Sequence, residues 1–290
     1  MFKGAFTAIV TPFKDGKVDE EALKAHVNRL IENGTDGLVP CGSTGESATL
    51  THAEHNRVID ITVETTAGRA PIIAGAGSNS TAETVKLTRH ALEAGADAAL
   101  LITPYYNKPS QHGLYEHYRT VAEAVDIPQI LYNVPGRTGV NMLPETVASL
   151  SELKNIVGIK EATADMQQIS DIIRASADDF CMLSGDDTTV LPFLSIGGHG
   201  VISVVANIAA ADMSALCRAY LAGDTEKALE LHYKLLPLSE AMFVDSNPVP
   251  VKTALAILGQ ISEELRLPLV ALSSQKRAMV ETALRNYGLI

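Results

Sequence analysis

A lysine that ends an apolar segment is the residue most suited to chemistry in this chain. Lys160 follows the run Ile156–Ile159, where burial is expected. Burial disfavours the charged ammonium, so the amine can be neutral and can attack a carbonyl carbon to form a Schiff base. Taken alone, the segment fits a lysine that extends to solvent better. Groups elsewhere in the chain reverse that preference.

Two further segments supply groups suited to imine chemistry. Tyr132 ends another apolar run, and Arg137 follows it in a Pro/Gly loop. A tyrosine hydroxyl near a neutral lysine can transfer protons, and an arginine can bind a carboxylate in two places. The loop Gly42–Glu46 offers backbone N–H groups and the hydroxyls of Ser43 and Thr44 to a second carboxylate. A core-edge aromatic, an exposed arginine and a capped turn are the plain alternatives.

Eight short apolar runs could position these groups. Each is followed by a turn signal and a segment of helical period, and none alternates with polar residues, which is typical of parallel strands covered on both faces. The runs are Ala5–Val10, Gly37–Pro40, Pro71–Ala74, Ala98–Ile102, Gln129–Tyr132, Ile156–Ile159, Phe180–Leu183 and Gly200–Val204. They predict an α/β fold, a closed (β/α)8 TIM barrel with its chemistry at the carboxyl ends of the strands. An open doubly wound sheet is the alternative.

The strand signal stops after residue 206. Residues 1–206 are therefore predicted to form the catalytic barrel, and residues 207–290 a C-terminal helical region that includes the last barrel helix. Helices are expected there over 207–222, 224–243, 248–260 and 270–287. Within the barrel, Thr51–Glu54 and Ser80–Glu83 each match a capping box at a helix start.

Composition and charge argue against several classes of function and location. A formal net charge of -11 argues against binding nucleic acid or an anionic membrane. The cysteines are odd in number without a C-x-x-C pair, which indicates reduced thiols in the cytoplasm; they are Cys41, Cys181 and Cys217. No targeting segment is visible, and prolines and glycines interrupt the uncharged run 188–211, so we expect no membrane span.

Neither a metal nor an organic cofactor is expected. No histidine follows an apolar run, and no H-x-H or HExxH pattern occurs, which disfavours a metal-dependent hydrolase. Asp186 and Asp187 could ligate a metal, but no histidine joins them. Gly75–Asn79 lacks the third glycine of a dinucleotide-binding fingerprint.

Three motifs in combination resemble one family. Gly42–Glu46, Tyr132–Gly139 and Gly158–Ala162 look like the pyruvate-dependent class I lyases of the N-acetylneuraminate lyase superfamily, and most closely the dihydrodipicolinate (4-hydroxy-tetrahydrodipicolinate) synthases. The resemblance extends from Gly4–Pro12 to Asn247–Lys252. It implies an enzyme that condenses pyruvate with L-aspartate-4-semialdehyde, the first committed step of lysine and diaminopimelate biosynthesis.

The resemblance also implies roles for single residues. The catalytic set that it implies is Lys160, Tyr132, Ser43 and Tyr106. Lys160 would form the imine with pyruvate, and the other three would relay protons, with Tyr106 supplied by an adjoining subunit. The substrate-binding set that it implies is Thr44, Arg137, Gly185, Ile202 and Asn247. Thr44 would bind the carboxylate of pyruvate and Arg137 that of the semialdehyde.

Feedback inhibition by L-lysine and a homotetramer, built as a dimer of dimers, are implied in the same way. The positions that match the family's allosteric lysine site are Ser47, Ala48, His52, His55, Asn79, Glu83 and Tyr105. The capping box explains Glu83 without a ligand, and exposed polar positions are the ordinary reading of His52 and His55. Tyr106 gives oligomerisation a physical motive, because only a neighbouring subunit could bring it to the relay.

Two other functions stay open. Ser43 stands where the family usually has threonine, and serine there is also typical of the N-acetylneuraminate lyases. An N-acetylneuraminate lyase or a 2-keto-3-deoxy sugar acid aldolase is therefore the alternative, although Arg137 favours the synthase. A catalytically silent barrel that binds or regulates is the third hypothesis, and the retained Lys160 and Tyr132 disfavour it.

Overall fold

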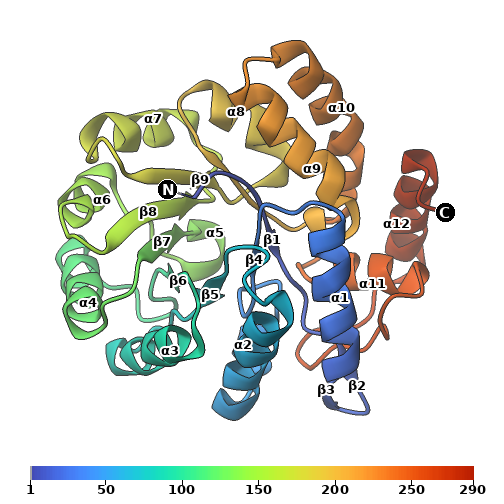
Figure 1. The fold of residues 1–290 in the computed structure, drawn as a ribbon, viewed down its shortest axis with the longest axis horizontal. Coiled ribbons are helices and arrows are strands. Elements are labelled where there is room, and N and C mark those ends of the chain that lie inside the picture. Colours follow the sequence, from blue (N-terminus) through green and yellow to red (C-terminus); the bar gives the residue numbers. More distant parts are fainter. Residues whose placement is uncertain (1) are drawn as a thin grey trace.

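The computed structural model describes residues 2–290 and forms a parallel barrel with added helices (Figure 1). Its barrel strands are β1 (Gly4–Ala8), β4 (Gly37–Val39), β5 (Ile73–Gly75), β6 (Ala98–Ile102), β7 (Gln129–Asn133), β8 (Ile156–Glu161), β9 (Cys181–Ser184) and β10 (Gly200–Ser203). Over residues 2–290 these eight strands are hydrogen-bonded in the order β4-β1-β10-β9-β8-β7-β6-β5. A parallel bridge between Leu38 and Ile72 closes the ring. The predicted TIM barrel is confirmed.

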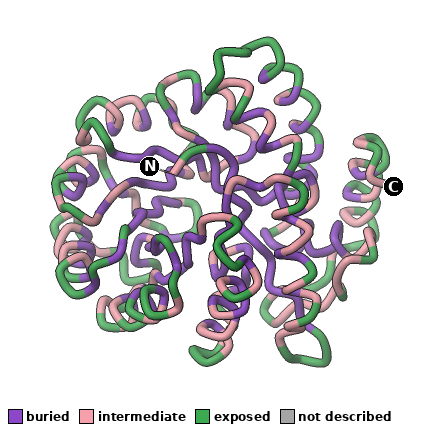
Figure 2. Tube along the Cα trace, viewed as in Figure 1, coloured by how far each residue is buried: buried purple, intermediate pink, exposed green. Residues whose placement is uncertain are grey.

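A helix follows each barrel strand and covers it from outside (Figure 1). These helices are α1 (Glu20–Glu32), α2 (His52–Thr66), α3 (Thr81–Ala94), α4 (Gln111–Ala124), α6 (Pro144–Ser151), α7 (Met166–Ala175), α8 (Val190–Ser195) and α9 (Ala206–Leu221). Three single turns lie in the loops at the carboxyl ends of the strands: η1 (Ser47–Thr49), α5 (Pro135–Thr138) and η2 (Asp187–Thr189). Figure 2 shows the burial that results, with buried residues on the strands and exposed ones on the outer faces of the helices.

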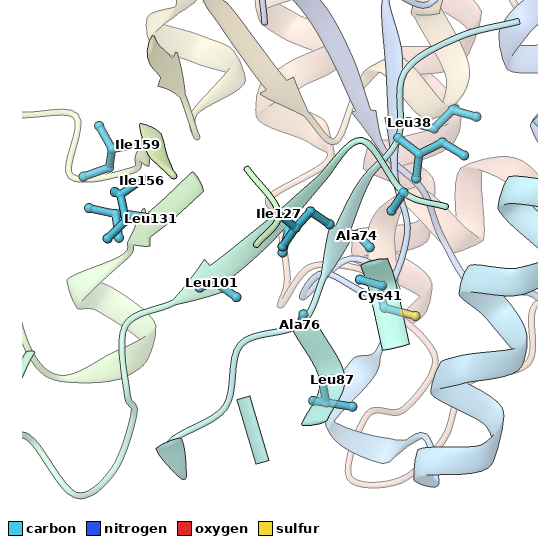
Figure 3. Close-up of a cluster of buried hydrophobic side chains, with 14 of the residues drawn as sticks. Leu38, Cys41, Ala74, Ala76, Leu87, Leu101, Ile127, Leu131, Ile156 and Ile159 are labelled. Atoms are coloured by element: carbon cyan, nitrogen blue, oxygen red, sulfur yellow. The ribbon is translucent and has the colours of Figure 1, made fainter. Parts of the chain in front are cut away.

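Strand residues alternate between two apolar clusters. Leu101 of β6, Leu131 of β7 and Ile159 of β8 belong to one buried cluster (Figure 3), which also contains residues of the outer helices such as Val147 of α6. Their neighbours Leu100 and Ile130 fill the interior of the barrel. Because successive strand residues face opposite sides, the position after Ile159 faces inward, toward the carboxyl end of the barrel axis.

The C-terminal helices pack together at one side of the barrel. They are α10 (Thr225–Ala241), α11 (Val249–Ile257) and α12 (Ser274–Tyr287). With α9, they lie where the sequence predicts helices, although α12 begins at 274 rather than 270. Leu235 and Val280 share one apolar cluster with Val201 and Met213 of the barrel. We propose the division between barrel and C-terminal region at residues 206 and 207, because only helices and loops follow in the described part of the chain.

Local details differ from the sequence-based expectation in two places. The antiparallel pair β2 (Phe13–Lys14) and β3 (Lys17–Val18) was not predicted. Its turn, Asp15-Gly16, has positive φ at both residues, as a tight hairpin requires. The uncharged run 188–211 is divided among a turn, two helices and a strand, and no helix within residues 2–290 has the length and apolarity to cross a membrane.

One of the two predicted capping boxes is wrong. At Thr51, the backbone N–H donates to Glu54 (2.9 Å) and the hydroxyl accepts from the Glu54 N–H (3.2 Å), as expected. At Ser80, the side chain makes no capping bond. The Glu83 carboxylate instead accepts from the Ser78 hydroxyl and contacts His52, because the chain before α3 presents Ser78 to it.

Candidate active site

Lys160 and Tyr132 lie side by side on neighbouring strands inside the barrel. The parallel register of β7 and β8 pairs the two residues directly. Lys160 Nζ is 4.3 Å from the centre of the Tyr132 ring, and each residue is only 6% exposed. The burial expected for Lys160 is therefore present, and a phenol stands next to its amine.

A cavity of about 430 Å³ opens around the lysine. Its lining includes Ser43, Thr44, Tyr132, Arg137, Lys160, Gly185 and Asn247. A second cavity of about 370 Å³ adjoins it, with Ser43, Tyr132, Arg137 and Asn247 in both linings. Volumes of this size suit small-molecule substrates. One amine and several groups that are able to bind a carboxylate therefore line the same cavity.

Asn247, two residues before α11 begins, connects the loop that carries Thr44 to the segment that carries Arg137. Its side-chain amide donates to Thr44 Oγ1 (3.0 Å), and its backbone carbonyl accepts from Arg137 (3.4 Å). The carboxamide oxygen of Asn247 is buried and has no hydrogen-bond partner within residues 2–290. This oxygen is thus available to a bound molecule.

Gly185, after β9, makes room for the lysine side chain. A Cβ at this position would lie 2.6 Å from Ala162 Cβ and 3.1 Å from Lys160 Cε. Real Cβ atoms essentially never approach as closely as the first distance, so any larger residue would displace Ala162 or Lys160.

A buried carboxyl group supports the same strand ends from the outer side. Glu161 follows Lys160 and accepts hydrogen bonds from Asn133 Nδ2 (3.0 Å) and the Thr163 N–H (2.8 Å). Burial raises the pKa of Glu161, and these donors partly oppose that effect. Glu161 therefore joins β7 to β8 beyond the point where Tyr132 and Lys160 meet.

Across residues 2–290, no three or more His, Cys, Asp or Glu side chains are grouped so that they could hold an ion. Asp186 and Asp187 diverge: Asp186 accepts from the Thr188 N–H, whereas Asp187 accepts from the N–H groups of Val204 and Val205. Both aspartates therefore organise backbone.

A family comparison agrees with this geometry. The model of the dihydrodipicolinate synthetase family matches residues 1–287. The chain belongs to the dihydrodipicolinate synthetase family. Two relatives, from Syntrophus aciditrophicus and Geotalea uraniireducens, are each 57% identical over 290 residues, with all of both chains covered. Both are named 4-hydroxy-tetrahydrodipicolinate synthase, and identity at this level over the full length makes this chain an enzyme of the dihydrodipicolinate synthetase family.

Solved structures of the family share the whole fold. The chloride-inhibited dihydrodipicolinate synthase from Acinetobacter baumannii, complexed with pyruvate, has a TM-score of 0.98 at 47% identity and covers 100% of both chains. The enzyme from Cyanidioschyzon merolae with lysine bound has a TM-score of 0.97 at 40% identity, covering 100% of this chain and 99% of its own.

Two residues of the predicted family site lie outside both cavity linings. Ile202 is buried in the apolar cluster of the barrel interior. Tyr106 is 88% exposed and has a φ of 73°. Within a single chain, Tyr106 therefore does not share a cavity with Tyr132 and Ser43.

The predicted lysine-site positions lie around the loops before α2, α3 and α4. Ser47, Ala48 and Tyr105 line the second cavity. His52 contacts Glu83 (Nε2 to Oε1, 2.7 Å), and Asn79 donates to the Tyr105 carbonyl (3.1 Å). The reading of His55 as exposed is wrong: it is 5% exposed, and burial lowers its pKa to about 4. His55 lies on the face of α2 that packs against the barrel.

Sequence reasoning assigned no role to Glu46, Lys252 or Glu161. Lys252 lies in the apolar helix α11, and a charged residue in such a helix needs a partner. That signal is readable, but the partner, Glu46, stands 206 residues away along the chain. Only the folded structure shows that Glu46 and Lys252 form a pair.

Proposed function

We propose that the chain is a 4-hydroxy-tetrahydrodipicolinate synthase that condenses pyruvate with L-aspartate-4-semialdehyde through an imine at Lys160. The observation that carries the proposal is the buried pair of Lys160 and Tyr132 in a cavity with two carboxylate-binding segments. The names of the full-length relatives support the same reaction.

In the first half-reaction, pyruvate becomes attached to the lysine. The unprotonated Nζ of Lys160 attacks the keto carbon, and a C–N bond forms. A proton passes from the nitrogen to the former carbonyl oxygen, which gives a carbinolamine. Its hydroxyl group takes up a second proton and leaves as water, and a protonated imine with Lys160 remains. Tyr132, whose ring lies 4.3 Å from Nζ, is the proton donor that we propose. Thr44 and the backbone N–H groups of the Gly42–Glu46 loop hold the carboxylate meanwhile.

In the second half-reaction, the tethered pyruvate meets the aldehyde. The pyruvate methyl group loses a proton to give an enamine, whose carbon bonds to the aldehyde carbon, and the aldehyde oxygen takes up a proton. The amino group of the semialdehyde then attacks the imine carbon. The bond to Lys160 breaks, the ring closes, and the amine is free again. Arg137 binds the carboxylate of the incoming semialdehyde in this proposal.

We propose that the proton relay of Tyr132 and Ser43 is completed by Tyr106 from a second copy of the chain, within a homotetramer. The exposure of Tyr106 and its absence from the lining of its own cavity support this arrangement. Ser43 replaces the usual threonine and retains the hydroxyl that the relay requires.

We propose that L-lysine inhibits the enzyme at the allosteric positions around His52, Asn79 and Glu83. A hydrogen bond from Ser78 lowers the pKa of Glu83, so this carboxyl group is ionised at neutral pH and can attract an ammonium group. The lysine complex of the Cyanidioschyzon merolae enzyme supports the choice of ligand. A cytoplasmic location is proposed from the cysteines, all three of which are buried and unbridged in the described chain.

Borohydride reduction in the presence of pyruvate tests the central claim. Peptide mass analysis should find one reduced pyruvate adduct, on the peptide that contains Lys160. The Lys160→Ala variant should gain no adduct and lose turnover, whereas Lys154→Ala, which removes an exposed lysine nearby, should behave as wild type. Parallel assays with N-acetylneuraminate and 2-keto-3-deoxy sugar acids should show no cleavage. Full turnover by Lys160→Ala would refute the proposal.

A further inference from the structure

The loop that carries Ser43 and Thr44 has an unfavourable backbone at both ends. Cys41 has a φ of 56° and Glu46 a φ of 52°, the left-handed region that residues with a Cβ avoid. Between them, the Gly45 N–H donates to the Gly42 carbonyl (3.0 Å), which closes a tight turn. Such a conformation persists only where the surrounding structure holds it.

A fully buried ion pair holds the final residue of this loop. Glu46 Oε1 is 2.6 Å from Lys252 Nζ, and the two side chains are 1% and 0% exposed. Glu46 Oε2 accepts a hydrogen bond from the Arg266 N–H (3.2 Å). The carboxylate thereby connects the loop to α11 and to the segment that follows α11.

The lysine of the pair is anchored by its own contacts. Lys252 Nζ donates to the Thr11 carbonyl (3.0 Å) and lies 4.3 Å above the centre of the Phe13 ring. The Thr11 hydroxyl in turn donates to the Gly45 carbonyl (2.7 Å). Burial lowers the pKa of Lys252, and the Glu46 carboxylate opposes that effect. The network therefore closes on the loop from two directions.

We propose that Glu46 and Lys252 are a positioning pair that fixes the Gly42–Glu46 loop in the geometry that binds the pyruvate carboxylate. The inference rests on the proposed function, because it takes Thr44 and the loop amides as the pyruvate site. α11 is the common support: Lys252 lies within it, and Asn247, which contacts Thr44, precedes it. The C-terminal region thus contributes to the affinity for the first substrate.

Stability alone does not account for this pair. A buried ion pair loses solvation that an apolar pair of equal volume does not lose, so replacing both partners together is often neutral for folding. An ion pair differs from an apolar pair because its attraction is directional. It holds one carboxylate oxygen of Glu46 at a defined position next to Lys252 Nζ. That property matters at the end of a loop whose backbone would otherwise relax.

The test compares Glu46→Gln, Lys252→Met and the double variant with wild type. Pyruvate KM, kcat, semialdehyde KM and the midpoint of thermal unfolding are measured for each. Both single variants should unfold at lower temperature, because one buried charge loses its partner. The double variant has no unpaired buried charge, so it should unfold at a higher temperature than either single variant. It should still show a pyruvate KM raised by about tenfold or more, with kcat and semialdehyde KM little changed.

Lys234→Met is the control for loss of an ion pair elsewhere, since it breaks an equally short, partly exposed pair (2.6 Å to Asp212) whose residues line neither cavity. It should leave pyruvate KM unchanged. If the substituted pairs do not fold, Glu46→Asp, which keeps the charge but withdraws the carboxylate, should raise pyruvate KM. A double variant or Glu46→Asp with wild-type pyruvate KM overturns the inference. Failure of wild type to form a borohydride adduct would instead overturn the proposed function.

Discussion

Lys160 and Tyr132 face each other across hydrogen-bonded strands, so the backbone ladder of β7 and β8 sets the distance between amine and phenol. Neither group depends on a mobile loop for its position. The proposed nucleophile, Lys160, and its proposed proton donor, Tyr132, are therefore already placed side by side before any substrate binds, which is the condition under which a positioned acid or base is most effective.

Tyr132→Phe should separate proton transfer from packing. The ring and its contact with Lys160 remain, but the hydroxyl is lost, so kcat should fall by about 100- to 10,000-fold while folding is kept. Tyr118→Phe is the control, since this buried hydroxyl donates to the Leu101 carbonyl away from the cavity (3.2 Å). Steady-state kinetics and circular dichroism measure the two effects. Equal kcat losses in the two variants would argue against the relay.

Arg137→Ala should affect only the second substrate. We expect kcat/KM for the semialdehyde to fall by about 10- to 100-fold, the value of a charge-assisted double hydrogen bond. Borohydride trapping with pyruvate alone should proceed as in wild type. The control is Arg174→Ala, which removes an exposed arginine of α7. Wild-type kcat/KM in Arg137→Ala would show that the assigned role is wrong.

Gly185→Ala should crowd the nucleophile. The added Cβ would meet Ala162 and the Lys160 side chain, and overpacking of this kind costs about 1–3 kcal/mol. We expect slower imine formation in single-turnover trapping. At Gly136 the same substitution meets nothing within 4 Å, so Gly136→Ala should be much milder. The opposite order of the two variants would contradict the packing argument.

Mixing two inactive variants should restore activity if Tyr106 acts across a subunit interface. Lys160→Ala lacks the nucleophile and Tyr106→Phe lacks the exposed hydroxyl. Each pair of one Lys160→Ala subunit and one Tyr106→Phe subunit has one complete site, formed by Lys160 from one subunit and Tyr106 from the other. After co-refolding, turnover should exceed the sum of the separate variants. No gain in an oligomer shown to be mixed would place Tyr106 outside the relay.

Acid should destabilise the protein through His26. This buried imidazole bonds Asn207 Oδ1 through Nε2 (2.8 Å) and approaches Arg29 through Nδ1 (2.6 Å). Burial, with Arg29 adding to it, lowers the pKa of His26 from 6.5 to about 4. Between these values the unfolded chain binds the extra proton and the folded chain does not, so stability falls as pH drops from 6.5 toward 4, by up to about 3 kcal/mol.

Urea unfolding across this pH range measures the effect. His26→Gln should be less stable than wild type at pH 7 but should lose less stability on acidification. His112→Gln removes an exposed histidine and should follow wild type at every pH. If His26→Gln keeps the wild-type pH dependence, His26 is not the source of it.

The sequence predicts the barrel well because its signals are local. Near-continuous apolar runs such as Ala98–Ile102 and Gln129–Asn133 are strands for a reason visible in the residues themselves, namely burial on both faces. The pair β2 and β3 escaped notice because two-residue strands carry no periodicity. The capping box predicted at Ser80 is wrong because the sequence pattern does not reveal that the Ser78 hydroxyl binds Glu83 instead.

Distant contacts within the site were beyond sequence reasoning. The motifs name Lys160, Tyr132 and Arg137, but their convergence is a property of the closed barrel. The burial of His55 depends on which face of α2 turns inward, and the amphipathic signal there is weak. The sequence shows that Lys252, in the apolar helix α11, needs a partner, but only the fold shows that this partner is Glu46.

The alternation along β8 makes the chemistry sensitive to a one-residue slip. Ile159 and Glu161 point toward the helices, while Lys160 alone of the three points into the barrel. Deleting a single residue upstream in this strand would place the Lys160 amine in the apolar layer between strands and helices. The side chain of a neighbouring residue would then face the cavity in its place. Such a protein could still close its ring of strands and would nonetheless be inert.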